Sequence, residues 1–244
     1  GKVILHAAAE RAIPAVVELG GKSAAVVMPD ADLDKVVNSA KGAIFGQAGQ
    51  ICSAMSRVIA HKSVKNELVD KLSNLANSLK VGHGSEDGTD LTPVISEEQL
   101  QKIENYSRSG QQAGANAVVG GKRVDRKGYF FEATVFDNVQ PEMTIAQEEI
   151  FGPVLSVLEY SDEEEAVSIA NNTEFGLAAG VFTNDVNKAT SMASQLNGGQ
   201  VYVNSWFTGS VATPFGGYKQ SGYSREKGQE AIKSYLQLKN IGIQ

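Results

Sequence analysis

Short apolar segments alternate with longer amphipathic ones along most of the chain, and this alternation constrains the fold more than any other feature. Strand-like runs at 15–19, 24–28 and 57–61 are separated by segments with helical periodicity. The clearest helix is expected at 63–79, where the apolar residues of one face are Val64, Leu68, Leu72, Leu75 and Leu79. Because alternating strands and helices generate parallel sheets, the pattern predicts a layered α/β domain with a largely parallel sheet.

The remaining elements follow from capping residues, breakers and apolar runs. Helices are expected at 2–12, from Asp30 or Asp32 to about Phe45, from Ser96 to Gly110 or Gly114, from Asp162 to about Asn171, from Asp185 to Asn197, and at 228–235. Further strands are expected at 117–119, 129–136, 154–160, 178–183, 200–204 and 236–243. The long loop 205–224 is rich in Gly, Ser and aromatic residues, and loops of this length in compact domains are usually functional or disordered.

Composition excludes several classes of function. The 244 residues carry a net charge of −6 and show no cluster of Lys and Arg, which argues against a nucleic-acid partner. No apolar run is long enough for a membrane span, so no membrane partner is expected. A single cysteine permits no internal disulfide, which fits the reducing cytoplasm.

The only cysteine, Cys52, lies in the segment Gly-Gln-Ile-Cys-Ser-Ala. A thiolate is a strong nucleophile and is favoured near a helix N-terminus or a positive charge. Gly49 would permit close approach of a substrate, and the backbone amide of residue 52 could donate to an oxyanion. A lone cysteine is also often a buried structural residue, so the residues around it leave both interpretations open.

Two glutamates show the same ambiguity. Glu18 interrupts the apolar run 15–17, and burial would give it the raised pKa that a general base requires. Glu149, when ionised, only accepts hydrogen bonds and therefore suits a pair of ribose hydroxyls, while Phe151 could pack against a flat ring. Both carboxylates could equally be solvated groups at a strand end or a turn.

Blocks spread over essentially the whole chain resemble the aldehyde dehydrogenase superfamily, and specifically the C-terminal, catalytic half of its NAD(P)-dependent members. These blocks are Glu18 to Ser23, Pro29 to Leu33, Gly49 to Cys52, Gly128 to Phe130, Glu148 to Pro153, Glu174 to Val181 and Pro214 to Gly222. The resemblance implies a three-layer α/β/α catalytic domain at 21–224. It also implies a remnant of the dinucleotide-binding domain at 1–20 and a C-terminal helix with an oligomerisation strand at 225–244.

The resemblance implies roles for individual residues. Cys52 would be the nucleophile that adds to the aldehyde, and Glu18 would be the base that activates the hydrolytic water. Glu149 would hold the nicotinamide-side ribose, with Phe151 beside it. The nicotinamide would be lined by Leu19, Gly20, Leu177 and Phe215, and the substrate pocket by Trp206, Phe207, Ile51 and Ser53.

The implied reaction oxidises a small-molecule aldehyde to a carboxylic acid through a thiohemiacetal and a thioester, with NAD or NADP as cofactor. Because Gly1 matches the end of the family's phosphate-binding turn, most of the cofactor site is expected to be absent from the chain, which by itself should be inactive. A homo-oligomer, either a dimer or a tetramer, is expected to form through the strand 236–243. No metal site is expected, because the three histidines lack ligand spacing.

Two residues near the thiol depart from the family pattern, since Gln47 replaces a usual Asn and Met55 a usual Gly. Two other functions remain as alternatives. One is an acylating relative that passes its thioester to coenzyme A, against which Glu18 argues because such relatives need no base for water. The other is a catalytically silent assembly module that uses the sheet and the last strand.

Overall fold

A seven-stranded sheet forms the middle layer of the computed structural model, which describes residues 1–244. Its strands lie in the order β4-β5-β6-β3-β2-β8-β9. All neighbouring strands are parallel except β4 and β5. Their bounds are β2 (Ala24–Val27), β3 (Arg57–His61), β4 (Asn116–Val119), β5 (Thr134–Asp137), β6 (Val154–Tyr160), β8 (Ala178–Phe182) and β9 (Gln200–Val203). The predicted α/β class with a largely parallel sheet is confirmed.

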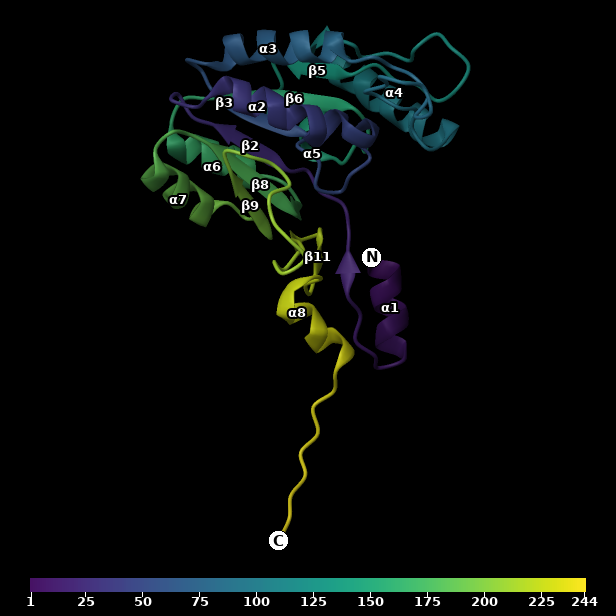
Figure 1. Ribbon diagram of the computed structural model, residues 1–244, viewed down its shortest axis with the longest axis vertical. Helices are drawn as coiled ribbons and strands as arrows, with labels where there is room; N and C mark the ends of the chain where they lie inside the picture. The colour runs from purple at the N-terminus through teal and green to yellow at the C-terminus, as the bar shows by residue number, and fades with distance from the viewer.

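Helices cover both faces of this sheet (Figure 1). They are α2 (Leu33–Ala40), α3 (Lys65–Ser78), α4 (Glu97–Gln112), α5 (Thr144–Gln147), α6 (Glu163–Asn171) and α7 (Val186–Gln195). The crossover from β2 to β3 runs in one direction along the sheet, and the crossovers from β6 to β8 and from β8 to β9 run in the other. Because such crossovers are right-handed, α2 lies on one face and α6 and α7 on the other. Helix α3 packs beside α2, and α6 beside α7, which gives three layers.

Capping residues set four of the eight α-helix starts as the sequence predicts. The side chains of Asp32, Ser96, Asp162 and Asp185 each accept a backbone N–H from the first turn of their helix, which satisfies donors that would otherwise lack partners. Ser63, the first residue of the helix predicted at 63–79, does not cap it. Its hydroxyl hydrogen-bonds to the His61 ring instead, and α3 begins without a side-chain cap.

The central strands are buried on both sides, and a charged side chain is buried with them. All four residues of β2 are buried, as expected for a strand covered by helices on both faces. The Arg57 side chain at the start of β3 is also buried, and its guanidinium donates to the carbonyls of Lys22, Ile169 and Ala170. These bonds tie β3 to the end of α6 and to the segment before β2.

A second region, which we call the arm, extends away from the layered body and comprises residues 1–18 and 222–244 (Figure 1). It contains α1 (Lys2–Glu10), β1 (Val17–Glu18), β11 (Gly222–Tyr223), α8 (Gly228–Ile232) and η3 (Lys233–Tyr235). Strand β1 pairs antiparallel with β11, which joins the two ends of the chain. Nearer the body, β7 (Phe175–Gly176) pairs with β10 (Tyr218–Lys219). None of the helices is long and apolar enough to cross a membrane.

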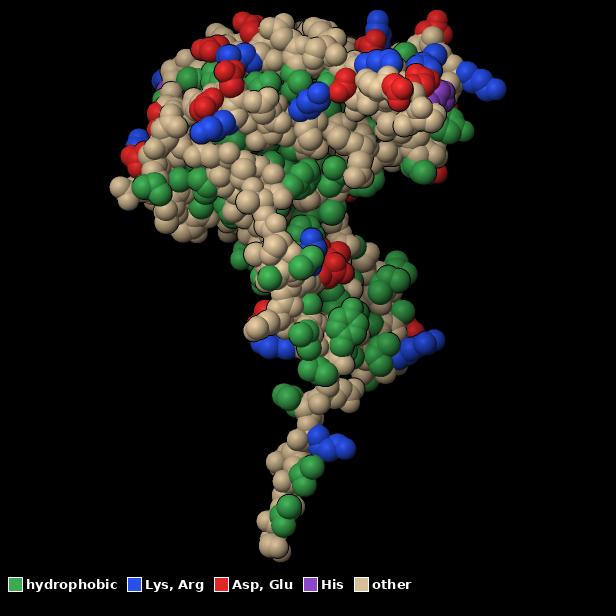
Figure 2. All heavy atoms as spheres, in the orientation of Figure 1, with side chains coloured by type: hydrophobic (Ala, Val, Ile, Leu, Met, Phe, Trp, Pro, Cys, Tyr) green, Lys and Arg blue, Asp and Glu red, His purple; other side chains and the backbone are tan.

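The arm exposes many apolar side chains, which Figure 2 shows along its length. The large ones are Val3, Ile4, Ile13, Val16, Tyr223, Ile232, Tyr235, Leu236, Leu238, Ile241 and Ile243. The predicted strand at 236–243 does not form in the single chain, because no neighbouring strand pairs with it. The predicted strand 129–136 is also shorter than expected, since regular pairing in β5 begins only at Thr134.

Candidate active site

Cys52 lies in the connection between α2 and β3, and this connection is not a regular helix. After α2 the chain forms a π-helical turn, η1 (Lys41–Phe45), and a 3-10 turn, η2 (Gly46–Gly49). Gln47, Ala48 and Gly49 all have positive φ, which is uncommon for residues other than glycine. A Cβ on Gly49 would collide with the carbonyl of Gly152. The turn that presents Cys52 therefore needs a glycine for close packing of two backbone segments.

The two departures from the family pattern lie in this region. Gln47 has a φ of 50°, in a region where Asn is favoured over most other residues, and its carbonyl accepts two hydrogen bonds from Gln50. Met55 is completely buried in the core, and its backbone N–H donates to Ala43. Met55 therefore packs behind the loop that carries the thiol.

The thiol of Cys52 is half-buried, and its surroundings favour the neutral form. Burial raises the pKa of the Cys52 thiol, and the carboxylates of Glu149 and Glu18 raise it further. Hydrogen bonds from the backbone of Ser53 and Cys52 oppose this effect. No positively charged side chain is among the largest influences on this pKa, contrary to the environment that would favour a thiolate. These surroundings therefore hold the thiol in its protonated form.

Glu18 lies at the end of β1, directly opposite Gly222 of β11. Both of its carboxylate oxygens are buried and have no hydrogen-bond partner. Burial raises the pKa of Glu18 to about 7, the negative charge of Glu226 raises it too, and Arg225 opposes the shift. The raised pKa predicted from the sequence is thereby confirmed, and it suits a general base near neutral pH.

Glu149 follows the short helix α5 and is anchored through one of its two oxygens. Its Oε1 accepts the backbone N–H of Gly21 at 3.0 Å. A Cβ on Gly20 would overlap the carboxylate, so this glycine leaves Oε2 accessible from that side. Burial raises the pKa of Glu149, while the Gly21 hydrogen bond and the charges of Lys102 and Lys22 lower it. The second oxygen is thus available to accept a hydroxyl.

The segment 18–21 brings the three groups together. Glu18 stands at one end of it, and Gly21 binds Glu149 at the other. A Cβ on Gly21 would fall against the Cys52 carbonyl and the Leu177 side chain. Leu177 is itself buried, and Leu19 lies against Gly1. The carboxylates and the thiol, which are far apart in the sequence, therefore surround one short stretch of backbone.

A pocket of about 480 Å³ opens beside Cys52. Its walls include Ile51 and Ser53, the neighbours of the thiol, together with Phe207 from the long loop. Phe215, which the family resemblance places at the nicotinamide, also lies on this wall. The other lining residues are Gln200, Tyr202, Thr208, Gly209, Ser210, Val211, Thr213 and Lys227.

Trp206 does not line this pocket, contrary to the expectation from the sequence. Its indole N–H donates to the Ser53 carbonyl at 3.0 Å, and its ring packs against Tyr202. An indole has a single donor, and here that donor meets a backbone acceptor in the interior. Trp206 therefore supports the pocket wall from behind and holds the loop after Cys52 in place.

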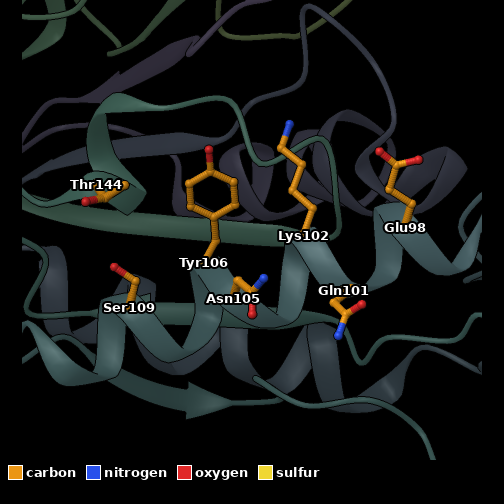
Figure 3. A pocket seen from close by; sticks show the side chains of 7 residues that line it. All are labelled: Glu98, Gln101, Lys102, Asn105, Tyr106, Ser109 and Thr144. Carbon is orange, nitrogen blue, oxygen red and sulfur yellow. The ribbon is translucent and has the colours of Figure 1, made fainter.

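A second hollow, of about 560 Å³, lies along α4, and sequence reasoning missed it (Figure 3). Lys102 and Tyr106 stand next to each other on its wall, as their spacing of four on a helix requires. The Tyr106 hydroxyl donates to Glu148 at 2.6 Å, and the charge of Lys102 lowers the pKa of Glu149. One residue of its wall therefore bonds to Glu148, and another influences the charge of Glu149. The helical spacing was visible in the sequence, but nothing local tied it to Glu149.

Lys22 is a further residue that sequence reasoning missed. Its side chain is completely buried and its ammonium has no hydrogen-bond partner. Burial lowers the pKa of Lys22 to about 7, and the nearby Arg57 lowers it further. No group of three or more His, Cys, Asp or Glu side chains is close enough to hold a metal ion.

Comparison with known proteins shows which family the chain resembles. Residues 1–241 match the aldehyde dehydrogenase family. A putative aldehyde dehydrogenase DhaS of Bacillus subtilis is 42% identical over 243 residues, which cover 100% of this chain and 49% of that protein. A betaine aldehyde dehydrogenase of Brucella melitensis is 41% identical over 249 residues, covering 100% of this chain and 51% of the relative.

Solved structures agree with the sequence relatives. The NAD+ complex of an aldehyde dehydrogenase from Bacillus cereus superposes with a TM-score of 0.94 at 42% identity. The superposition covers 96% of this chain and 48% of that one. The chain spans about half the length of the curated relatives it matches. On these grounds the chain belongs to the aldehyde dehydrogenase family.

Proposed function

We propose that this chain is the catalytic half of an NAD(P)-dependent aldehyde dehydrogenase that oxidises an aldehyde to a carboxylic acid. One observation carries the proposal. The only thiol of the chain lies in the field of two largely buried carboxylates, and both of them meet at the segment 18–21. The proposal concerns the chemistry of this half, whatever its position in the longer relatives.

The first step would be addition of Cys52 to the aldehyde. The sulfur forms a bond to the carbonyl carbon, and the carbonyl oxygen becomes the hydroxyl of a thiohemiacetal. Because the thiol is protonated at neutral pH, its proton would pass through solvent water to the carbonyl oxygen as the sulfur attacks, which leaves Glu18 for the later hydrolysis. The wall formed by Ile51 and Phe207 would hold the rest of the aldehyde beside the sulfur.

The second half of the reaction would release the acid. When bound, the nicotinamide ring would supply the acceptor for the hydride; loss of this hydride, with release of the hydroxyl proton to solvent, turns the thiohemiacetal into a thioester. Glu18 would then remove a proton from water as the water oxygen attacks the thioester carbon. The bond to sulfur breaks, the carboxylic acid leaves, and the Cys52 thiol is restored. Dividing the oxidation in this way is the benefit of a covalent intermediate.

The residues around Glu149 fit the ribose of such a cofactor. Oε1 is fixed by the Gly21 amide, and the missing Cβ at Gly20 leaves Oε2 free to accept a ribose hydroxyl. Burial raises the pKa of Glu149, and the Gly21 hydrogen bond and the charge of Lys102 oppose this and favour the ionised, accepting form. The resemblance places Phe151 beside the ribose, and the Gln99 side-chain amide donates a hydrogen bond to the Phe151 carbonyl. Leu19 and Leu177 would lie nearer the nicotinamide.

The domain assignment and the assembly belong to the same proposal. We assign 1–20 to the dinucleotide-binding domain, 21–224 to the catalytic domain and 225–244 to a C-terminal helix and oligomerisation strand. The unpaired, apolar tail supports a homo-oligomer, because an exposed extended segment can add to the sheet of a second copy. A cytoplasmic location remains a prediction from the single cysteine.

The raised pKa of Glu18 favours hydrolysis over transfer of the thioester to coenzyme A. An acylating enzyme has no need for a base that ionises near pH 7, whereas hydrolysis by water does. Aldehyde oxidation with and without coenzyme A in the intact enzyme separates the two reactions. Turnover that requires coenzyme A would overturn the hydrolytic assignment.

The proposal as a whole is tested by aldehyde oxidation in the intact enzyme and its Cys52→Ala variant, followed as reduced cofactor. We expect the parent to reduce NAD or NADP with an aldehyde and the variant to lose this activity. A parent that oxidises no aldehyde from a panel of aliphatic and aromatic compounds, or a variant that retains turnover, would contradict it.

A further inference from the structure

The pocket beside Cys52 carries a single charge. Of its twelve lining residues only Lys227 belongs to a charged residue type, and no carboxylate lies on the wall. The remaining polar groups are uncharged hydroxyls and an amide, from Ser53, Gln200, Tyr202, Thr208, Ser210 and Thr213. A substrate in this pocket therefore meets one positive charge on the wall, while the carboxylates of Glu18 and Glu149 lie toward the thiol.

The backbone on both sides of Lys227 is tied to the pocket wall. The preceding residue, Glu226, exchanges two backbone hydrogen bonds of 2.7 Å with Phe215. The following residue, Gly228, donates its N–H to Val211 at 2.9 Å. Lys227 itself has a φ of 59°, a conformation that favours glycine. A lysine in such a conformation persists only where its surroundings hold it, and such residues concentrate at functional sites.

The Lys227 ammonium also occupies the aromatic surface that a cationic substrate would need. Its Nζ lies 5.1 Å from the centroid of the Phe215 ring, within the range of a cation–π contact. The neighbouring carboxylate of Glu226 faces Glu18, whose pKa it raises, and it does not line the pocket. The pocket thus lacks both an acid and a free aromatic face at this position.

We propose that Lys227 determines charge selectivity for the aldehyde, so that the pocket accepts neutral or anionic aldehydes and rejects those with a quaternary ammonium group. This inference rests on the proposed function, because it assumes that the aldehyde occupies the pocket. Two unit charges about 7 Å apart, at a dielectric constant between those of protein and water, change the binding constant of the charged ligand about five- to tenfold. The effect should appear in kcat/KM as a ratio between substrates of equal shape.

The test compares two aldehydes that differ only in charge, using the intact enzyme. Betaine aldehyde carries a trimethylammonium group, and 3,3-dimethylbutanal has a tert-butyl group of nearly the same size in its place. The ratio of their kcat/KM values is measured for the parent and for Lys227→Met, Lys227→Glu and Lys227→Arg. A Lys62→Glu variant serves as the control. It makes the same change in net charge as Lys227→Glu, but Lys62 follows the last residue of β3, whereas Cys52 precedes the first.

We expect the parent to prefer 3,3-dimethylbutanal. The ratio should shift toward betaine aldehyde about fivefold in Lys227→Met and at least about tenfold in Lys227→Glu, and stay unchanged in Lys227→Arg and Lys62→Glu. Two results would refute the charge selectivity of Lys227 while leaving the proposed function intact. In the first, both aldehydes are oxidised but Lys227→Glu leaves the ratio within twofold of the parent. In the second, Lys62→Glu shifts the ratio as much as Lys227→Glu does. If the parent oxidises neither aldehyde and no other, the proposed function fails and this inference fails with it.

Discussion

The layered body and the arm differ in how completely each buries its apolar side chains. In the body, β2 and its neighbour β3 lie between two layers of helices, and Val26 and Ile59 are inaccessible to solvent. In the arm, Leu238 is fully exposed and Tyr235 nearly so. The body therefore contains its own hydrophobic core, whereas the arm presents apolar surface that a second molecule could cover.

The proposed catalytic groups are divided between these two regions. Cys52 is held by the body, through the turn before β3 and the Trp206 bond to Ser53. Glu18 belongs to the arm, where a two-residue ladder with β11 and the bond from the Leu19 N–H to the Ser221 carbonyl fix its backbone. The position of the proposed nucleophile should therefore depend on the packing of the core, whereas the position of the proposed base should depend on the contacts of the arm. The variants below test this difference, from the largest expected effect to the smallest.

Replacing Cys52 by Ala should remove aldehyde oxidation from the intact enzyme. No other thiol is present in the chain, and loss of a catalytic nucleophile typically costs about four to six orders of magnitude in turnover. Reduced cofactor is measured at saturating aldehyde, with thermal unfolding as the control for folding. A variant that melts like the parent and retains more than a trace of turnover would exclude Cys52 as the nucleophile.

Replacing Glu18 by Gln should slow release of the acid more than formation of the thioester. The amide keeps the shape but cannot accept a proton from water, and general-base catalysis typically contributes about a hundred- to ten-thousandfold. Rapid mixing should show a burst of reduced cofactor followed by slow turnover. Steady-state turnover equal to that of the parent would rule out the assignment of Glu18 as the base.

A pair of isoleucine substitutions compares the two regions directly. Ile59 is buried in the body and Ile241 is exposed in the tail. Ile59→Ala should lower the free energy of unfolding by about 2–5 kcal/mol, because it leaves a cavity in the core. Ile241→Ala should change the stability of the monomer by less than about 0.5 kcal/mol, as exposed substitutions do.

Chemical denaturation measures both free energies, and sedimentation velocity follows assembly in the same samples. We expect Ile241→Ala to weaken self-association while Ile59→Ala lowers stability. Equal losses of stability in the two variants would show that the arm is packed as firmly as the body.

The smallest effect concerns the pH dependence of acid release. Glu18 acts as a base only when ionised, so hydrolysis of the thioester should rise with pH through about 7. Glu226→Gln removes a negative neighbour and should move this rise to lower pH, whereas Arg225→Met removes a positive neighbour and should move it to higher pH. Steady-state rates between pH 5 and 9 measure the shift. Movement of both variants in the same direction would contradict the electrostatic account.

Much of the body could be predicted from the sequence because its signals are local. Apolar runs located the strands, and Asp32, Ser96 and Asp162 marked helix starts through their own first turns. The end of α2 could not be predicted in this way. The turns at 41–49 depend on the close contact of Gly49 with Gly152, a hundred residues away in the sequence.

The site shows the same division between local and non-local signals. Cys52, Glu18 and Glu149 stood out through their glycine-rich neighbours and the family resemblance. The buried position of Trp206, the approach of Lys102 to Glu149 and the position of Lys227 on the pocket wall depend on contacts between distant segments. The tail at 236–243 reads as a strand, yet a strand requires a neighbour that the single chain does not supply.

The central claim is that oxidation passes through a thioester on Cys52 that Glu18 helps to hydrolyse. The most direct measurement is the mass of the peptide containing Cys52 after the intact Glu18→Gln enzyme has reacted with an aldehyde and oxidised cofactor. We predict that this peptide gains the mass of the acyl group, that the adduct disappears on treatment with hydroxylamine, and that the parent enzyme shows much less of it. An unmodified Cys52 peptide after a burst of reduced cofactor, or an acyl group on any other residue, would contradict the account.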